Sequence, residues 1–246
     1  MPPRPAVKRP ARAGRAAPLR VVVTDVDGTL TDRRRRLDPA AVAAVQRVEE
    51  RGIPVVLATG NVLPIALALH RSLGLSGPIV AENGGLIWRG DRRGEKAIER
   101  VADPRPARAA YRALRRARVP VRRLFTDRWR ETEIALEPTV PIRRLRAVLG
   151  ARPVRIESTG YAIHLIDARA GKAVAVARAL AGIGRTLGEA AVLGDGDNDV
   201  DMLRAAGWSG SFPSGSARAR SAAGFVSRAP FARGFVEGLK ASGVLR

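Results

Sequence analysis

Short apolar runs of strand length alternate with segments of helical periodicity along the first part of the chain. Val21–Val23 predicts a strand, and the apolar residues of Pro39–Glu50 recur at helical spacing. Further strands are predicted at Val55–Ala58 and Ile79–Ala81, with a helix at Leu63–Leu73 between them. An alternation of strands and helices predicts a parallel sheet with right-handed crossovers.

The pattern changes after Asn83-Gly84-Gly85, where polar residues interrupt the apolar runs, as in a sheet with one exposed face. Strands are predicted here at Leu86–Trp88, Val121–Phe125, Glu131–Leu136, Val154–Glu157 and Ala162–Ile166, and helices at Ala107–Ala117 and Pro141–Leu149. The first pattern then returns, with helices predicted at Lys172–Leu180, Val200–Ala206 and Ala229–Ala241, and strands at Ala191–Leu193 and Phe225–Val226.

These elements predict an α/β protein with a Rossmann-like parallel-sheet core, residues 19–84 and 168–246, and a smaller inserted α/β unit, residues 85–167. Residues 1–18 hold five basic residues and five prolines but no apolar segment of a secretory signal, so we expect a disordered basic tail. No apolar run approaches the roughly 20 residues that span a bilayer, so no membrane partner is expected.

The charge balance leaves nucleic-acid adhesion open as a function. The chain has 44 Lys and Arg against 23 Asp and Glu, a net charge of +21, which attracts polyanions and small phosphates alike. Aromatic residues make up only 4% of the chain, too few for a base-stacking platform, and we find no recognition-helix module. Specific nucleic-acid binding is therefore not expected. The absence of cysteine excludes disulfides and thiolate metal sites, and it fits a cytoplasmic protein.

Polar residues follow each strand of the predicted core. In an open α/β sheet, ligands bind beyond the carboxyl ends of the strands, so these residues are expected to share one rim. The residues expected at this rim are Asp25, Asp27, Thr59, Gly60, Asn61, Glu82, Asn83, Lys172, Asp195, Asn198 and Asp199.

The carboxylates at the rim require a cation, because like charges at close range repel. Four are expected there, those of Asp25, Asp27, Asp195 and Asp199. Oxygen ligands without histidine or cysteine favour a hard ion, and Mg²⁺ takes a few carboxylates together with substrate phosphate. Thr59 and Lys172 are then expected to bind phosphate oxygens, with Gly60 letting the backbone come close.

Four motifs in this order resemble the haloacid-dehalogenase superfamily of aspartate-nucleophile phosphatases. They are DVDGT at 25–29, the hydroxyl residue Thr59, Lys172, and GDGDND at 194–199. The segments TGNVLPIALAL at 59–69, AENGG at 81–85, TDRWRE at 126–131 and STGYAIHLID at 158–167 are similar to the archaeal-type phosphoglycolate phosphatases. That group often has Asn at position 29 and Ser at position 59, where this chain has Thr in both places.

The resemblance implies a chemistry for each motif. Asp25 is the nucleophile that forms an aspartyl-phosphate, and Asp27 protonates the leaving group and later activates water. Mg²⁺ is implied on the side chains of Asp25 and Asp195 and the backbone carbonyl of Asp27, with Asp199 acting through water or as an orienting group. Substrate phosphate is implied on Thr59, Gly60, Lys172 and Asn198.

The insert, in the position of a cap over the core, is expected to set the substrate, a small phosphorylated organic acid, with 2-phosphoglycolate the first choice. Sugar or glycerate phosphates are the alternative within the group, and a basic protein that adheres to nucleic acid is the alternative from another class.

Four further features of the sequence concern the insert, the loop after the first strand and the two histidines. Arg128 and Arg130 flank Trp129; they either line an exposed strand edge, or one of them binds the substrate carboxylate with its forked guanidinium. Arg33–Arg36 is expected to be a solvated loop, and the second interpretation is that its charge concentrates anions near DVDGT. His164 is expected to pack and hydrogen-bond near the junction of insert and core, and His70 to lie on a helix surface.

Overall fold

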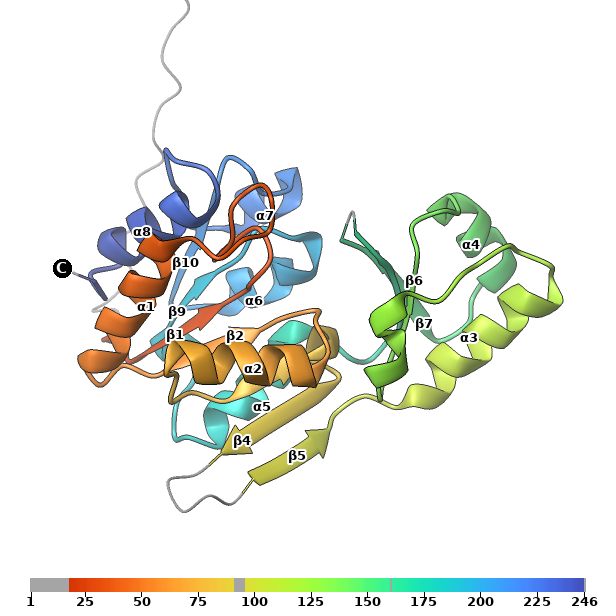
Figure 1. The fold of residues 1–246 in the computed structure, drawn as a ribbon, viewed down its shortest axis with the longest axis horizontal. Helices are drawn as coiled ribbons and strands as arrows, with labels where there is room; N and C mark the ends of the chain where they lie inside the picture. Colours follow the sequence, from red (N-terminus) through yellow and green to blue (C-terminus); the bar gives the residue numbers. More distant parts are fainter. Residues whose placement is uncertain (1–17, 91–95, 160, 246) are drawn as a thin grey trace, which may run out of the picture.

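The computed structural model describes residues 18–90, 96–159 and 161–245, and its larger part is an eight-stranded sheet in the order β11-β10-β9-β1-β2-β3-β4-β5 (Figure 1). Neighbouring strands from β11 to β3 pair in parallel, whereas β4 and β5 add antiparallel. The strands are β1 Val21–Thr24, β2 Val55–Ala58, β3 Ile79–Ala81, β4 Leu86–Gly90, β5 Lys96–Arg100, β9 Ala190–Leu193, β10 Trp208–Ser211 and β11 Phe225–Val226. The predicted α/β class with a mostly parallel sheet is confirmed.

Helices cover both faces of this sheet. On one face lie α1 Pro39–Glu50, α2 Leu63–Leu73 and α8 Phe231–Ala241, and on the other α5 Lys172–Ala181, α6 Val200–Ala205 and α7 Ala217–Ala222. Alternate residues of β1 enter the two cores, since Val22 belongs to the first and Val21 and Val23 to the second. A central strand buried on both sides has to be apolar throughout, which explains the uninterrupted valines.

The smaller part has an antiparallel sheet in the order β6-β8-β7. Its elements are α3 Pro104–Arg116, β6 Ile134–Leu136, α4 Ile142–Leu149, β7 Val154–Ser158 and β8 Ile163–Asp167. Helices α3 and α4 cover the outer face of this sheet (Figure 1), where Ile163 and Leu165 pack with Leu114 and Leu145. Because side chains alternate along a strand, His164 points to the opposite face, toward the larger sheet.

Two strands within the residues that were assigned to the insert belong to the larger sheet. β4 pairs with β3 and β5 pairs with β4, so residues 86–100 extend that sheet. The division predicted at residue 85 therefore falls inside the larger sheet. β5 was not predicted, because its sequence KAIER has only two apolar residues, with charged residues on both sides, as suits an edge strand. β10 and α7 were also not predicted.

The strand predicted at Val121–Phe125 is wrong. Only Arg123 forms a bridge, with Leu136, and the chain then turns into the 3₁₀ helix η2, Phe125–Trp129. The buried carboxylate of Asp127 causes the turn, since it accepts a hydrogen bond from the backbone N–H of Ala135 (2.6 Å) and pairs with Arg123. The strand predicted from Glu131 begins only at Ile134, in β6.

The loop after β3 fastens the smaller part to the larger sheet. Glu82, Asn83 and Gly84 all have positive φ, of 51°, 53° and 97°. The Glu82 carboxylate accepts hydrogen bonds from the backbone N–H of Glu131 and from both the N–H and the hydroxyl of Thr132. A Cβ on Gly84 would lie 2.4 Å from the carbonyl oxygen of Gly171, so only glycine allows this close crossing. The loop therefore contacts the smaller part itself, at Glu131 and Thr132, and the segment that returns from it, at Gly171.

Two expectations concern other parts of the chain. The predicted basic tail lies outside the described residues except for Pro18. Within the part of the chain that the structure describes, no helix combines the length and the apolar character needed to cross a membrane.

The expectation that His70 lies on a helix surface is wrong. His70 is 6% exposed, its Nε2 donates a hydrogen bond to the carbonyl of Gly77 (2.7 Å), and its ring meets the edge of Trp88 at 5.1 Å. The helical spacing of Leu63, Ala66 and His70 places all three on the buried face of α2.

We expect the stability of the fold to fall as the pH drops below about 6.5, partly because of His70. Burial lowers the pKa of His70 below its usual 6.5, so the unfolded chain takes up a proton before the folded one does. Protonation then favours unfolding. Urea unfolding from pH 7.5 to 5.0 of the wild type and of His70→Gln, which keeps an amide donor, measures the contribution as a smaller loss in the variant. Identical losses would contradict it.

Candidate active site

A cavity of about 230 Å³ lies between the carboxyl ends of the parallel strands and the inner face of the smaller sheet. The larger part contributes Asp25, Asp27, Gly28, Asp32, Arg33, Arg35, Gly60, Asp195, Gly196, Asn198 and Phe231. The smaller part contributes Arg130, Ser158, Thr159, Tyr161 and His164. A cavity of this size, closed from two sides, suits a small molecule better than a polymer.

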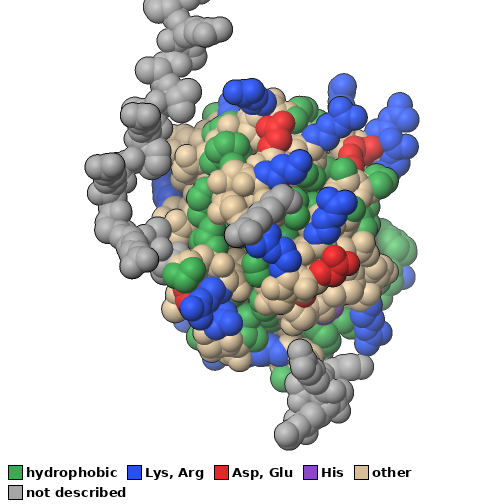
Figure 2. Space-filling model, turned by 90° about the vertical axis from the view of Figure 1, so that its left-hand side faces the viewer, with side chains coloured by type: hydrophobic (Ala, Val, Ile, Leu, Met, Phe, Trp, Pro, Cys, Tyr) green, Lys and Arg blue, Asp and Glu red, His purple; other side chains and the backbone are tan. Residues whose placement is uncertain are grey.

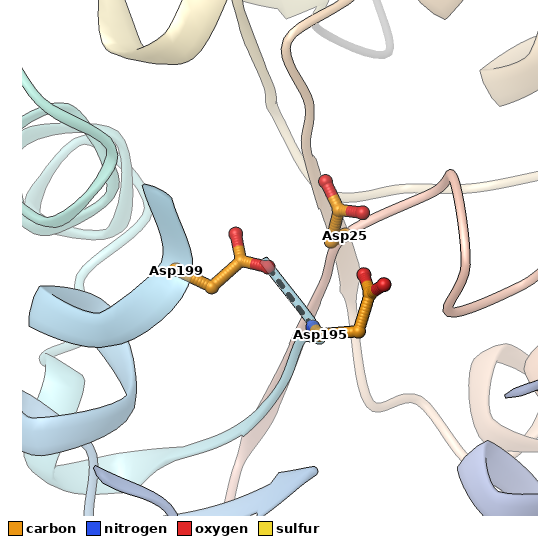
Figure 3. Close-up of side chains that lie close together, drawn as sticks. All are labelled: Asp25, Asp195 and Asp199. Carbon is orange, nitrogen blue, oxygen red and sulfur yellow. Dashed lines mark hydrogen bonds between the residues drawn. The ribbon is translucent and has the colours of Figure 1, made fainter. Parts of the chain in front are cut away.

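Asp25, Asp195 and Asp199 come together at the floor of this cavity (Figure 3). Asp25 directly follows β1 and Asp195 follows β9, and these strands are neighbours in parallel register, with Thr24 opposite Leu193. One carboxylate oxygen from each aspartate lies within 4.8 Å of the others. The sequence analysis expected this meeting of strand ends.

Lys172, at the start of α5, is buried between two of these carboxylates. Its Nζ donates hydrogen bonds to Asp25 Oδ1 (2.6 Å) and to Asp199 Oδ1 (2.7 Å). Asp199 Oδ2 accepts hydrogen bonds from the backbone N–H groups of Asp195 (3.0 Å) and Gly196 (2.9 Å), the first of which is drawn in Figure 3. Both oxygens of Asp199 are therefore engaged, whereas Asp25 Oδ2 and Asp195 Oδ2 accept no hydrogen bond from the described residues.

The cluster carries more negative charge than Lys172 balances. Burial raises the pKa of Asp25 well above its usual range, and the charges of Asp199 and Asp195 add to this although Lys172 opposes it. Burial, with the charge of Asp199, also raises the pKa of Asp195 to about 7. Burial disfavours the ammonium of Lys172, but Asp199 and Asp25 outweigh it and raise the pKa of the lysine.

This donor set fits a hard divalent cation. The carboxyl groups of Asp25 and Asp195 resist ionisation in their present surroundings, so a cation beside these two side chains would remove the charge imbalance. All the donors are oxygens, the ligands that Mg²⁺ prefers. Gly28 lets the loop after β1 lie close to the side chain of Asp195, because its φ is 84° and a Cβ there would lie 2.3 Å from Asp195 Oδ2.

The side chain of Asp27 stands apart from the three other carboxylates. Its Oδ2 accepts a hydrogen bond from Asn61 Nδ2 (2.8 Å), and the backbone N–H of Asn61 donates to Thr59 Oγ1 (3.1 Å). The side chain of Asp27 is thus held on the side of the cavity formed by the loop after β2. Asn61 is an orienting residue that the sequence placed at the rim without a role. Thr59 is buried below the cavity lining, whereas Gly60 is part of that lining.

A hydrogen-bonded chain links the smaller sheet to the loop after β9. Asn198 Nδ2 donates to Asn83 Oδ1 (2.9 Å), and Asn83 Nδ2 donates to Glu133 Oε2 (3.0 Å). Glu133 Oε1 lies 3.0 Å from His164 Nδ1 and pairs with Arg130. His164 was expected near this junction, but Glu133 had no predicted role, because nothing in the sequence distinguishes this buried glutamate from the partly exposed Glu137 nearby.

The two arginines around Trp129 face different surroundings. The Arg128 guanidinium lies over the rings of Phe125 (4.5 Å) and Trp129 (5.6 Å) on the outside of the smaller part. The Arg130 side chain is 3% exposed and lines the cavity. The Arg33–Arg36 loop is exposed, and it also reaches the cavity. The guanidinium of Arg35 stacks there on the ring of Tyr161 at 4.3 Å.

Comparison with known proteins assigns this site to a family. Residues 22–134 and 142–237 match the profile of haloacid dehalogenase-like hydrolases. A protein of Methanothermobacter thermautotrophicus named phosphoglycolate phosphatase is 34% identical over 222 residues, which cover 90% of this chain and 98% of that one. One of the same name from Methanoculleus marisnigri is 35% identical over 228 residues, 90% of this chain and 96% of the relative. The solved structure of Thermoplasma acidophilum 0175 has a TM-score of 0.83 at 27% identity and covers 93% of this chain and 100% of its own.

Proposed function

The chain belongs to the haloacid dehalogenase-like hydrolases, and on that premise we propose that it is a Mg²⁺-dependent phosphatase of small phosphorylated acids, with 2-phosphoglycolate as its substrate. The observation that carries the phosphatase chemistry is the position of Asp25: one oxygen is held by Lys172, and the other faces the cavity beside Asp195. The choice of 2-phosphoglycolate is supported by the names of the archaeal relatives.

In the proposed reaction, Asp25 Oδ2 attacks the phosphorus atom, the bond from phosphorus to the ester oxygen breaks, and an aspartyl-phosphate forms. Asp27, held by Asn61, gives its proton to the departing alkoxide. The same carboxylate then takes a proton from water as the water attacks the aspartyl-phosphate, which releases phosphate and restores Asp25. Lys172 keeps the attacking carboxylate oriented through its second oxygen.

The side chains of Asp25 and Asp195, with the backbone carbonyl of Asp27, would hold Mg²⁺, and Asp199 would orient the ligands from behind. When bound, the ion offsets the repulsion between the carboxylates and the dianionic phosphate. Thr59, Gly60 and Asn198 lie in or directly beneath the cavity lining, where they would bind the phosphate oxygens.

A phosphate-release assay over a panel of phosphate esters tests the proposal. We expect 2-phosphoglycolate to give the highest kcat/KM, and we expect EDTA to reduce turnover to the background rate and added Mg²⁺ to restore it. A higher kcat/KM for a sugar phosphate or a phosphoglycerate would replace the substrate and leave the chemistry standing. Turnover that persists in EDTA would contradict the metal dependence.

The alternative of a nucleic-acid-adhering protein is less well supported. On the face shown in Figure 2, Lys and Arg side chains are scattered among other residues and form no continuous band. A dispersed basic surface of this kind favours weak adhesion that depends strongly on salt. Aromatic residues make up only 4% of the chain, which is a poor supply for a base-stacking platform.

A further inference from the structure

We propose that Arg130 and His164, held in place by Glu133, form a recognition site for a second anionic group of the substrate, a carboxylate remote from the phosphate. This inference rests on the proposed phosphatase function and narrows it. It assigns the site to short phosphate esters that carry a carboxylate, and it names the residues that select them.

Glu133 is the centre of the site. Its side chain is fully buried, and it pairs with Arg130 and lies 3.0 Å from both His164 Nδ1 and Asn83 Nδ2. Burial acts to raise the pKa of Glu133, but the charges of His164 and Arg130 outweigh burial and lower it. Glu133 is therefore an anion that can hold both neighbours in one orientation.

Arg130 has hydrogen-bonding capacity that the protein does not use. Its Nη1 donates to the carbonyl oxygen of Gly60 (2.9 Å) and to Glu133, but its buried Nε has no hydrogen-bond partner among the described residues. Leaving a cationic donor unpaired in a closed cavity is costly, so a ligand whose acceptor meets the unengaged part of this cavity-lining guanidinium gains affinity. The forked donors of a guanidinium match the two oxygens of a carboxylate.

His164 supplies the second contact. Its neighbours Ile163 and Leu165 pack into the core of the smaller part, so the imidazole points the other way and lines the cavity. Glu133 engages Nδ1, which leaves Nε2 as the ring nitrogen for a ligand. Both proposed contacts are thus set by one buried carboxylate.

The position of the site explains why it selects small acids. The bond from Arg130 to Gly60 places the guanidinium directly against the loop proposed to bind phosphate. A molecule that reaches from the phosphate position to Arg130 inside about 230 Å³ has to be short. Arg128 lies outside the cavity. Arg33 and Arg35 line the cavity from an exposed loop, where Arg35 is stacked on Tyr161.

Arg130→Ala, with Arg128→Ala as the matched control, tests the proposal on two substrate pairs. Each pair joins an acid to its neutral counterpart: 2-phosphoglycolate with 2-hydroxyethyl phosphate, and 3-phosphoglycerate with glycerol 3-phosphate. Loss of a charge-assisted contact predicts that Arg130→Ala raises KM for the preferred acid about 10- to 100-fold and that for its neutral counterpart less than about 3-fold. Arg128→Ala should change neither. Equal losses on both members of the pair would overturn the proposal.

Glu133→Gln tests the positioning role. We expect KM for the acid to rise at least about 10-fold more than KM for the neutral ester, because Glu133 holds both groups that contact the carboxylate. Inhibition by glycolate should weaken, whereas inhibition by inorganic phosphate should not. If inhibition by phosphate weakens equally, Glu133 and Arg130 only support the phosphate loop, and the recognition site is overturned.

Two further measurements keep the outcomes distinct. If Arg130→Ala fails to fold because Glu133 is left buried and unpaired, the double variant Arg130→Met/Glu133→Gln carries the same substrate comparison. Calorimetric binding of 2-phosphoglycolate to Asp25→Asn, with and without Arg130→Ala, needs no turnover, and equal affinities would overturn the site.

Preference for another phosphorylated acid removes 2-phosphoglycolate as the substrate but supports the site. A phosphatase with no acid preference in either pair removes the site and leaves the phosphatase.

Discussion

Asp25→Asn is expected to lower kcat for phosphate release at least about 10⁴-fold, because the amide cannot form the aspartyl-phosphate. The amide oxygen can still accept the hydrogen bond from Lys172, so the surrounding geometry should be kept. Single-turnover assays with Mg²⁺ measure the effect. Asp197→Asn is the matched control from the GDGDND motif and should retain near-normal turnover, since among the described residues the Asp197 side chain bonds only to Ser216 and the exposed Arg218.

The same variant is expected to melt at a higher temperature than the wild type in metal-free buffer. The pKa of Asp25 is raised in the fold, so at neutral pH its ionised form costs stability, and a neutral amide removes that cost. Added Mg²⁺ should raise the melting temperature of the wild type more than that of the variant. Salt-sensitive adhesion to polyanions should be unchanged. Turnover that survives in Asp25→Asn would rule out the nucleophile assignment.

Lys172→Met is expected to destabilise the metal-free protein by about 3–5 kcal/mol, because it removes the cation from a buried cluster and leaves Asp25 and Asp199 facing each other. We also expect kcat to fall by about 10²-fold or more, since the attacking carboxylate loses the group that orients it. Urea unfolding in EDTA measures the first effect, and phosphate release in saturating Mg²⁺ measures the second.

A double-mutant cycle with Asp199→Asn separates the ion pair from simple packing. If Lys172 acts through its charge, the loss of stability in the double variant should be clearly smaller than the sum of the two single losses. Strict additivity would mean that Lys172 contributes mainly by filling space. Lys172→Arg should not restore activity, because a planar guanidinium cannot take the position of a compact ammonium between two carboxylates.

The part of the site that belongs to the larger sheet was predictable, because its residues directly follow the ends of parallel strands. Parallel strands deliver the residues that follow them to one edge, so Asp25, Asp195 and the loop of Thr59 had to meet once the strands were identified. The position of Lys172 at the start of α5 followed from the same topology. The apolar runs of β1, β2 and β9 were clear because these strands are buried on both faces.

The side formed by the smaller part was not predictable in the same way. Arg128 and Arg130 are two positions apart in one irregular segment, and the first lies outside the cavity whereas the second lines it. The turn that separates them is fixed by the hydrogen bond that Asp127 accepts from the backbone N–H of Ala135. Glu133 looks like any surface glutamate until β6 and β8 pair. His70 could have been placed correctly, because its spacing from Ala66 already put it on the buried face of α2.

The fastening loop after β3 has a consequence for attempts to transplant specificity between relatives. Glu82 and Asn83 belong to the larger sheet by sequence, yet their side chains dictate where Thr132 and Glu133 sit. A chimera that exchanges only residues 101–170 would combine the smaller part of one protein with the Glu82 and Asn83 of another, although these two residues fix its position. A chimera that also exchanges the loop after β3 keeps Glu82 with Thr132 and Asn83 with Glu133 from the same protein.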